Sequence, residues 1–193
     1  MTPKTMSTMI VVPTSPSPTA APPIHYTPSK IANVHLEFDY PGSWYSHDEK
    51  MPYTDTIVIY LADPRVLTVP TRTPDEPHGV PSDFGNIEIW IDPIKPNQTR
   101  DSLVEEQKRI NSSTWGLTLL NDYPIEIDGH DGHVLETLID FPDLYTSVMF
   151  TRRIFFIAYD QVYTIDFAVA KQDRGGEFEQ GYDYFFKSLK IVP

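Results

Sequence analysis

A short segment rich in aspartate and histidine is the part of this chain whose residue types could bind a metal ion. It contains Asp128, His130, Asp131 and His133 within six residues. Carboxylate and imidazole groups together suit zinc or manganese, so the segment is a candidate divalent-metal site. Two glycines lie among the same residues, and Asp with Gly is also the usual composition of a tight turn. We expect the turn, and the metal site remains the alternative.

Two neighbouring arginines, Arg152 and Arg153, lie in a segment with strand character. Successive side chains of a strand point to opposite faces of a sheet, so the two guanidinium groups cannot share one face. If one face packs against helices, one arginine is expected to form an ion pair with a carboxylate. The alternative is an anchor for an anionic ligand, because arginine offers paired donors to carboxylate or phosphate.

Trp44 and Tyr45 form the candidate partner-binding surface. They follow the Pro41-Gly42 pair, which is typical of a turn. Aromatic residues on strands usually pack in the core, but aromatic residues just after a turn can be exposed. If exposed beside the proline-rich segment 62–84, they would offer a surface to a protein partner.

Composition excludes several classes of function. The chain has no cysteine, which excludes thiolate catalysis, disulfides and cysteine-ligated zinc. No GxSxG, HExxH, P-loop or GxGxxG motif occurs, so we expect a protein that is not an enzyme. The formal net charge of −12 argues against nucleic acid and anionic lipid as partners, since both are held by clustered Lys and Arg. No apolar run approaches the length of a transmembrane segment.

The sequence divides into two parts of different composition. Residues 1–30 are rich in Pro, Ser and Thr and contain no acidic residue, which predicts a disordered linker or tether. Their PTSP tetrapeptide also matches a PxxP ligand motif, a second reading that we consider weaker. Residues 31–193 have the hydrophobic content of a single folded domain.

Hydrophobic periodicity predicts strands and two helices within the domain. Alternation or apolar runs predict strands over residues 34–40, 56–61, 86–91, 117–127, 134–141, 145–158 and 162–170. Thr99 is the expected N-cap of the first helix, and its apolar stripe would contain Leu103, Gln107 and Ile110, with Val104 alongside. A second helix is expected from Phe178 to Leu189, where aromatic residues recur with helical period. Asp160-Gln161 is the expected two-residue hairpin turn, and short turns between strands predict an antiparallel sheet with helices on its faces.

Several short motifs resemble the PsbP-like family, which is named for an extrinsic subunit of photosystem II and includes bacterial exported proteins of unknown function. FDYPGSW at residues 38–44 is similar to the family's first strand and loop. The pattern continues with IEIDGHDGHVLE at 125–136 and VYTIDF at 162–167. Residues 178–191 are similar to the family's closing helix and strand. The resemblance covers residues 34–192 and implies an α/β (α+β) fold, an α/β/α sandwich with a central antiparallel sheet. It implies no specific activity.

These observations together predict a non-catalytic binding module with an unidentified protein partner, comparable to an assembly factor. The proline-rich tract predicts that the domain is exported or tethered to a bacterial cell surface, as in a lipoprotein, with no complete signal sequence in this chain. The alternative function is a small-ligand or divalent-metal-binding protein that uses the 128–133 turn. We expect no cofactor unless that turn binds a metal.

Overall fold

The computed structural model describes residues 21–27, 33–63, 85–142 and 147–193. The proline-rich segment 64–84, the first 20 residues and residues 28–32 and 143–146 lie outside this part. The PTSP motif and most of the segment predicted beside the aromatic surface therefore also lie outside it.

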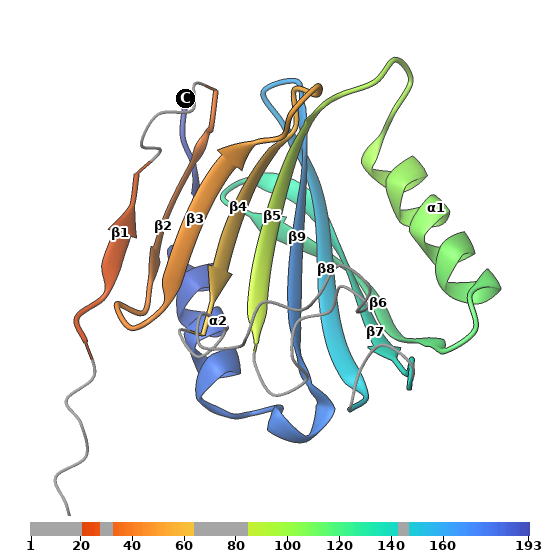
Figure 1. Ribbon diagram of the computed structural model, residues 1–193. Helices are drawn as coiled ribbons and strands as arrows, with labels where there is room; N and C mark the ends of the chain where they lie inside the picture. The colour runs from red at the N-terminus through yellow and green to blue at the C-terminus, as the bar shows by residue number, and fades with distance from the viewer. Residues whose placement is uncertain (1–20, 28–32, 64–84, 143–146) are drawn as a thin grey trace, which may run out of the picture.

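A seven-stranded antiparallel sheet is the centre of the fold (Figure 1). Its strand order is β3-β4-β5-β9-β8-β7-β6. The strands are β3 (Tyr45–Lys50), β4 (Ile57–Ala62), β5 (Asn86–Pro93), β6 (Leu117–Ile127), β7 (His130–Ile139), β8 (Met149–Ala158) and β9 (Gln161–Ala170). Strands β3 to β5 and strands β6 to β9 are consecutive along the chain, and consecutive strands are antiparallel neighbours in the sheet.

A second, three-stranded antiparallel sheet and two helices complete the domain. The small sheet has the order β1-β2-β10, with β1 (Ile24–Tyr26), β2 (Leu36–Tyr40) and β10 (Lys190–Ile191). The helices are α1 (Arg100–Ser113) and α2 (Glu177–Ser188), and a 3-10 turn, η2 (Lys171–Asp173), precedes α2. In Figure 1, α1 and α2 lie on opposite sides of the large sheet. The predicted α+β fold with a central antiparallel sheet is confirmed. No helix among the described residues is long and apolar enough to span a bilayer.

The main core lies between one face of the large sheet and a layer made of the small sheet and α2. Leu36 and Phe38 of β2 are almost fully buried, as are Phe167 of β9 and Phe185 of α2. Aromatic rings meet edge to face or stacked, with 4.9 Å between the ring centroids of Phe38 and Phe185. Burial of this aromatic and aliphatic surface is the main source of folding free energy.

Local signals explain most element boundaries. Thr99 is the N-cap of α1, as predicted: its Oγ1 accepts from the Ser102 amide at 3.1 Å, and Ser102 Oγ accepts from the Thr99 amide at 2.9 Å. The stripe of α1 differs from the prediction, because Val104 and Asn111 are the buried residues and Ile110 is exposed.

Two strands were missed and one turn was placed a residue too late. β3 is largely charged, and β1 lies in the segment predicted as a linker. The closing strand that the family resemblance implies is the two-residue β10. β1 nevertheless pairs with β2, with Tyr26 opposite Phe38, so the folded domain begins before residue 31. In the β8–β9 hairpin the turn residues are Tyr159 and Asp160, both with positive φ, and Gln161 already pairs with Ala158. Positive φ angles at both central residues are characteristic of a type I′ hairpin turn.

The contact between Trp44 and α2 generates the first prediction. A Cβ atom on Gly181 of α2 would lie 2.4 Å from Cζ2 of Trp44. Alanine normally stabilises a helix by about 1 kcal/mol over glycine, but this clash should reverse the sign. We expect Gly181→Ala to lower the free energy of unfolding by about 1–3 kcal/mol, measured by urea denaturation.

Asp183→Ala, at an exposed position of the same helix, is the matched control and should be close to neutral. In a Trp44→Leu background the Gly181→Ala change should cost less. Equal or greater stability of the single Gly181→Ala variant would contradict the packing described.

Candidate functional site

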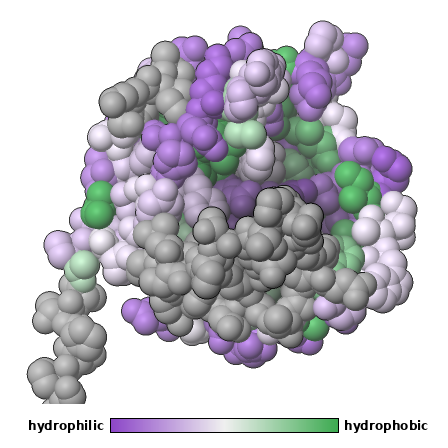
Figure 2. All heavy atoms as spheres, viewed as in Figure 1, coloured by the Kyte–Doolittle hydropathy of each residue, from purple (hydrophilic) through white to green (hydrophobic). Residues whose placement is uncertain are grey.

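A cleft lies between α1 and the face of the large sheet opposite the main core. Its cavity volume is about 330 Å³, at the small end of the range for ligand sites. Figure 2 shows, in the same view as Figure 1, a hollow with hydrophilic atoms in the middle of this face. α1 contacts β6, β7 and β8, and the cleft lies between the helix and the polar side chains of β5, β8 and β9.

Strand alternation makes the floor of the cleft polar. On β5, the residues Ile87, Ile89 and Ile91 face the core and have no exposed surface. The alternate residues Asn86, Glu88 and Trp90 therefore face the other side of the sheet, and Asn86 and Glu88 line the cleft. The other polar side chains of the lining are Gln107, Asn111, Thr137, Thr151, Arg153 and Asp166.

Three charged side chains lie in a row across neighbouring strands at the floor. The strand register places Glu88 of β5 opposite Asp166 of β9, and Asp166 opposite Arg153 of β8. Arg153 donates from Nε and Nη2 to the two oxygens of Asp166, at 2.5 and 2.8 Å. Its Nη1 donates to Gln107 of α1. Arg153 thus forms the ion pair expected for one arginine, and it also links the helix to the sheet.

Among the described residues, Glu88 is the acidic group of the cleft that forms no ion pair, although the charge of Arg153 acts on it. Its Oε1 accepts from Asn86 Nδ2 at 3.1 Å and its Oε2 accepts from Trp90 Nε1 at 3.2 Å. Burial raises the pKa of Glu88, and the negative charge of Asp166 adds to that rise, against the hydrogen bond from Trp90. The carboxylate is therefore held in a site that penalises its negative charge.

Asn86 leaves an acceptor unsatisfied at the same place. Its residue surface is 5% exposed, and its Oδ1 has no hydrogen-bond partner within the part of the chain that the structure describes. A buried acceptor without a donor costs about 1–3 kcal/mol. Such a group in a cleft marks a position where a ligand can supply the missing donor.

The opposite end of the cleft is apolar. Its residues come from the start of β6, the end of β7, the residues after it and the start of β8: Leu117, Ile139, Phe141 and Met149. At this end the exposed ring of Trp115 lies 6.5 Å from that of Phe141. The cleft thus has a charged end and an aromatic, apolar end.

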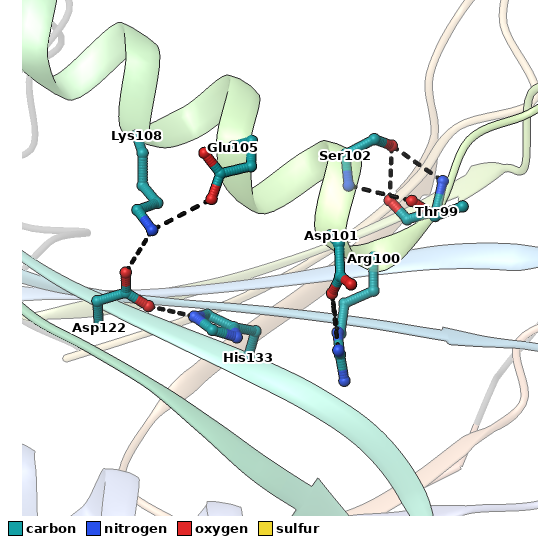
Figure 3. Close-up of polar contacts among 8 residues, drawn as sticks. All are labelled: Thr99, Arg100, Asp101, Ser102, Glu105, Lys108, Asp122 and His133. Atoms are coloured by element: carbon teal, nitrogen blue, oxygen red, sulfur yellow. Dashed lines mark hydrogen bonds and ion pairs between the residues drawn. The ribbon is translucent and has the colours of Figure 1, made fainter.

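A polar network fixes α1, which is the wall of the cleft, to β6 and β7 (Figure 3). Lys108 of α1 lies 2.6 Å from Asp122 Oδ2 and 3.2 Å from Glu105. The other oxygen of Asp122 contacts His133. The hydrogen bonds from Lys108 and His133 lower the pKa of Asp122. Closer to the cleft, Asn111 donates to Thr137 Oγ1 at 3.0 Å.

The structure does not gather the four predicted metal ligands. Asp128 and Gly129 form the β6–β7 turn with positive φ, and Asp128 Oδ2 accepts from the Ile191 amide at 2.9 Å. His130 and His133 are three residues apart on β7 and so point to opposite faces. Asp131 lies beside the start of α1, whereas His133 contacts Asp122. No group of three or more possible ligands lies together among the described residues.

Trp44 lies in a different environment from the exposed one predicted. Its half-buried ring stacks on Phe178 of α2, with centroids 4.4 Å apart, and packs against the main core. Tyr45 begins β3, and its ring meets that of Tyr60 edge to face. The position of Trp44 is therefore that of a residue that attaches α2 to the domain.

Arg152 lies on the core face, opposite to Arg153. Its Nε donates to Glu136 at 2.9 Å, and its guanidinium lies 5.2 Å from the ring centroid of Tyr182. Burial would raise the pKa of Glu136, but hydrogen bonds from Asn121 and Arg152 hold it below its usual value. This second ion pair is enclosed by α2. Both arginines therefore have a carboxylate partner: Glu136 for Arg152 and Asp166 for Arg153.

Sequence reasoning missed the residues that form the cleft, apart from Arg153 and Gln107. Asn86, Glu88 and Asp166 carried a detectable signal, because each is a polar residue at an alternating position of an apolar strand. Their convergence depends on pairing between β5 and β9, which are far apart in sequence.

Comparison with solved structures shows which known fold the chain resembles. The chain is similar to PsbP from the cyanobacterium Synechocystis, with 18% identity, a TM-score of 0.55 and coverage of 91% of this chain and 95% of that one. The fold is PsbP-like. LpqN of Mycobacterium tuberculosis, described as involved in cell envelope biogenesis, has 9% identity, a TM-score of 0.55 and coverage of 82% and 83%. A Pseudomonas aeruginosa protein of unknown function, PA94, has 13% identity, a TM-score of 0.50 and coverage of 83% and 91%.

No family model matches the sequence, and no curated protein matches it significantly. The identities to PsbP, LpqN and PA94 are all low. The likeness of this PsbP-like domain to them is therefore a likeness of fold.

The Asp122 network generates the second prediction. We expect Asp122→Asn to lower the melting temperature at pH 7 by no more than roughly 2–4 °C, because exposed ion pairs contribute little. The native pKa of Asp122 is depressed, so its stabilisation is present above the ordinary value of 3.8 and is lost as pH falls through the lower native value.

Calorimetric scans of both proteins between pH 7 and the lowest pH at which they remain folded provide the measurement. The two melting temperatures should converge at the acid end. A difference that stays constant over that range would argue against a charge-based role for Asp122.

Proposed function

We propose that this PsbP-like domain is a non-catalytic binding module, and that a segment of a protein partner enters the cleft beside α1. The observation that carries the proposal is the unsatisfied, 5% exposed Asn86 at the polar end of that cleft. An unsatisfied polar group is costly in the empty protein and becomes favourable when a ligand supplies its donor. Polar groups placed in a concave site in this way determine ligand orientation.

The carboxylate oxygens of the cleft already accept hydrogen bonds from neighbouring side chains. Both oxygens of Asp166 accept from Arg153, and each oxygen of Glu88 accepts from a neighbouring side chain. A general base needs an oxygen directed at a substrate proton and a nucleophile or water beside it. The cleft therefore favours binding over catalysis.

A protein partner is favoured by the rim of the cleft. Trp115 is 74% exposed and lies next to Phe141 at the apolar end. Exposed aromatic residues are enriched in protein–protein interfaces, where they supply large contact areas with few rotatable bonds. The partner segment would then contact Trp115 outside the cleft and place one side chain inside it.

Membership of the PsbP-like family and action outside the bacterial cytoplasm form part of the same proposal. The fold and the short motifs support membership of the family. The proline-rich tract, as a surface tether, supports action outside the cytoplasm. The description of LpqN, a protein of similar fold, as involved in cell envelope biogenesis supports the same location.

Filling the cleft tests the binding function. Ala168 lines the cleft on β9, and Ala168→Phe would occupy it. Peptides selected from a displayed random library on the full chain should lose at least tenfold in affinity for Ala168→Phe, measured by fluorescence polarisation. Trp115→Ala, which changes only an exposed side chain, should also weaken them.

Thr118→Phe, at an exposed position of the edge strand β6, is the matched control and should bind as the unchanged chain does. Melting temperatures of all three variants verify that they are folded. Peptides that bind Ala168→Phe and Trp115→Ala without loss, or a selection that enriches none, would overturn the proposal.

A further inference from the structure

We propose that the cleft recognises a protonated nitrogen, an ammonium or guanidinium group, carried on an apolar carbon chain. This inference rests on the proposed function, because it names the chemistry that the same cleft selects. Within a protein partner, the matching group is a lysine or arginine side chain. A free alkylamine offers the same chemistry from another source.

The first argument is hydrogen-bond complementarity. Asn86 Oδ1 is a buried acceptor without a donor among the described residues, and Asn86 Nδ2 is already engaged by Glu88. Nδ2 keeps a second N–H, but the atom left without any partner among those residues is the Oδ1 acceptor, and this is the atom that a ligand donor would satisfy. Ammonium and guanidinium groups are donors without acceptor capacity, so they match it and a carboxylate or phosphate does not.

The second argument is the charge of the lining. Two carboxylates, Glu88 and Asp166, and one guanidinium, Arg153, are the charged groups that the described residues contribute to the cleft, and they leave one negative charge in excess. The Nε, Nη1 and Nη2 atoms of Arg153 donate to Asp166 and Gln107. Among these residues an anionic ligand would therefore meet Glu88 and no uncommitted cation, and a cationic ligand would compensate Glu88.

Glu88 is suited to such a ligand by its surroundings. The titratable or charged groups facing it are Tyr60 on β4, Asp166 on β9 and Arg153 on β8. Burial and Asp166 raise its pKa above the ordinary 4.5, so the empty cleft disfavours the charge that a cation would stabilise. Binding of a cation should consequently weaken as pH falls and Glu88 becomes protonated.

The third argument is the apolar end. Leu117, Ile139 and Met149 contribute hydrocarbon surface to the same cavity of about 330 Å³. A volume of this size accepts a small group, such as one long side chain, and excludes a folded surface. The methylene stem of lysine or arginine can pack on apolar residues while its charged end forms polar contacts.

Three six-carbon probes test the inference on the full chain. Hexylamine, hexanol and hexanoate each have six carbon atoms, and their polar ends are cationic, neutral and anionic respectively. Two-dimensional NMR titration should show saturable shifts of the Asn86 side-chain amide with hexylamine at concentrations where hexanol and hexanoate cause none. Glu88→Gln should weaken hexylamine binding at least tenfold. Glu126→Gln, which removes one carboxylate at an exposed position of β6, should leave it unchanged.

A second arm distinguishes the sources of the cation. Peptides that bind the chain should lose affinity when their lysine or arginine is replaced by norleucine or citrulline, and the loss should disappear in Glu88→Gln. Asn86→Leu serves as a further variant, verified as folded by its melting temperature, and should weaken both hexylamine and the peptides.

The outcomes separate this inference from the proposed function. Peptides displaced by Ala168→Phe but indifferent to their own charge and to Glu88→Gln would overturn the inference and leave the binding module in place. Hexylamine binding without any selected peptide would support the inference and contradict the protein partner. Equal binding of hexanol or hexanoate would overturn the cationic specificity.

Discussion

The structure depends on one constraint, which is that the two faces of the seven-stranded sheet must differ in chemistry. One face is closed by α2 and the small sheet and is almost entirely aliphatic and aromatic, with Ile87, Ile89 and Phe167 fully buried. The other face carries Glu88, Asp166 and Arg153 at the intervening positions. Because side chains alternate along a strand, a shift of one residue in the register would place charges in the core. The polar floor of the cleft therefore depends on this register, which places Glu88, Asp166 and Arg153 on the face opposite the core.

Among the described residues, α1 is the element that covers the polar face, and its position decides where a ligand could bind. α1 packs on β6, β7 and β8, and a few polar contacts fix it there: Lys108 with Asp122, Asn111 with Thr137, and Gln107 with Arg153. The apolar cluster under it, within the part of the chain that the structure describes, consists of Val104, Leu103, Leu135 and Phe155. A helix held mainly at polar points leaves a cavity that a fully apolar interface would have filled.

Residues that look functional in the sequence can have structural roles, and the reverse also holds. Arg152 is enclosed near aromatic rings and compensated by Glu136, so its role is to satisfy a buried charge. His133 completes a contact that positions α1. Trp44 attaches α2, and the close approach of its ring is the reason that α2 contains a glycine at position 181. By contrast, Asn86 and Glu88 carried no motif and form the polar end of the cleft.

The sequence by itself determined the elements and the fold class. Thr99 with Ser102 set the start of α1, the aromatic period set α2, and apolar alternation set most strands, because these signals are local and each acts within a few residues. It did not determine β1 or β3, whose pairing depends on a neighbouring strand, nor that Tyr159 and not Gln161 occupies the hairpin turn. Only the tertiary structure decided which polar residues meet. Glu88, Asp166 and Arg153 come together through strand pairing between β5, β9 and β8, and such long-range register is not encoded at any single position.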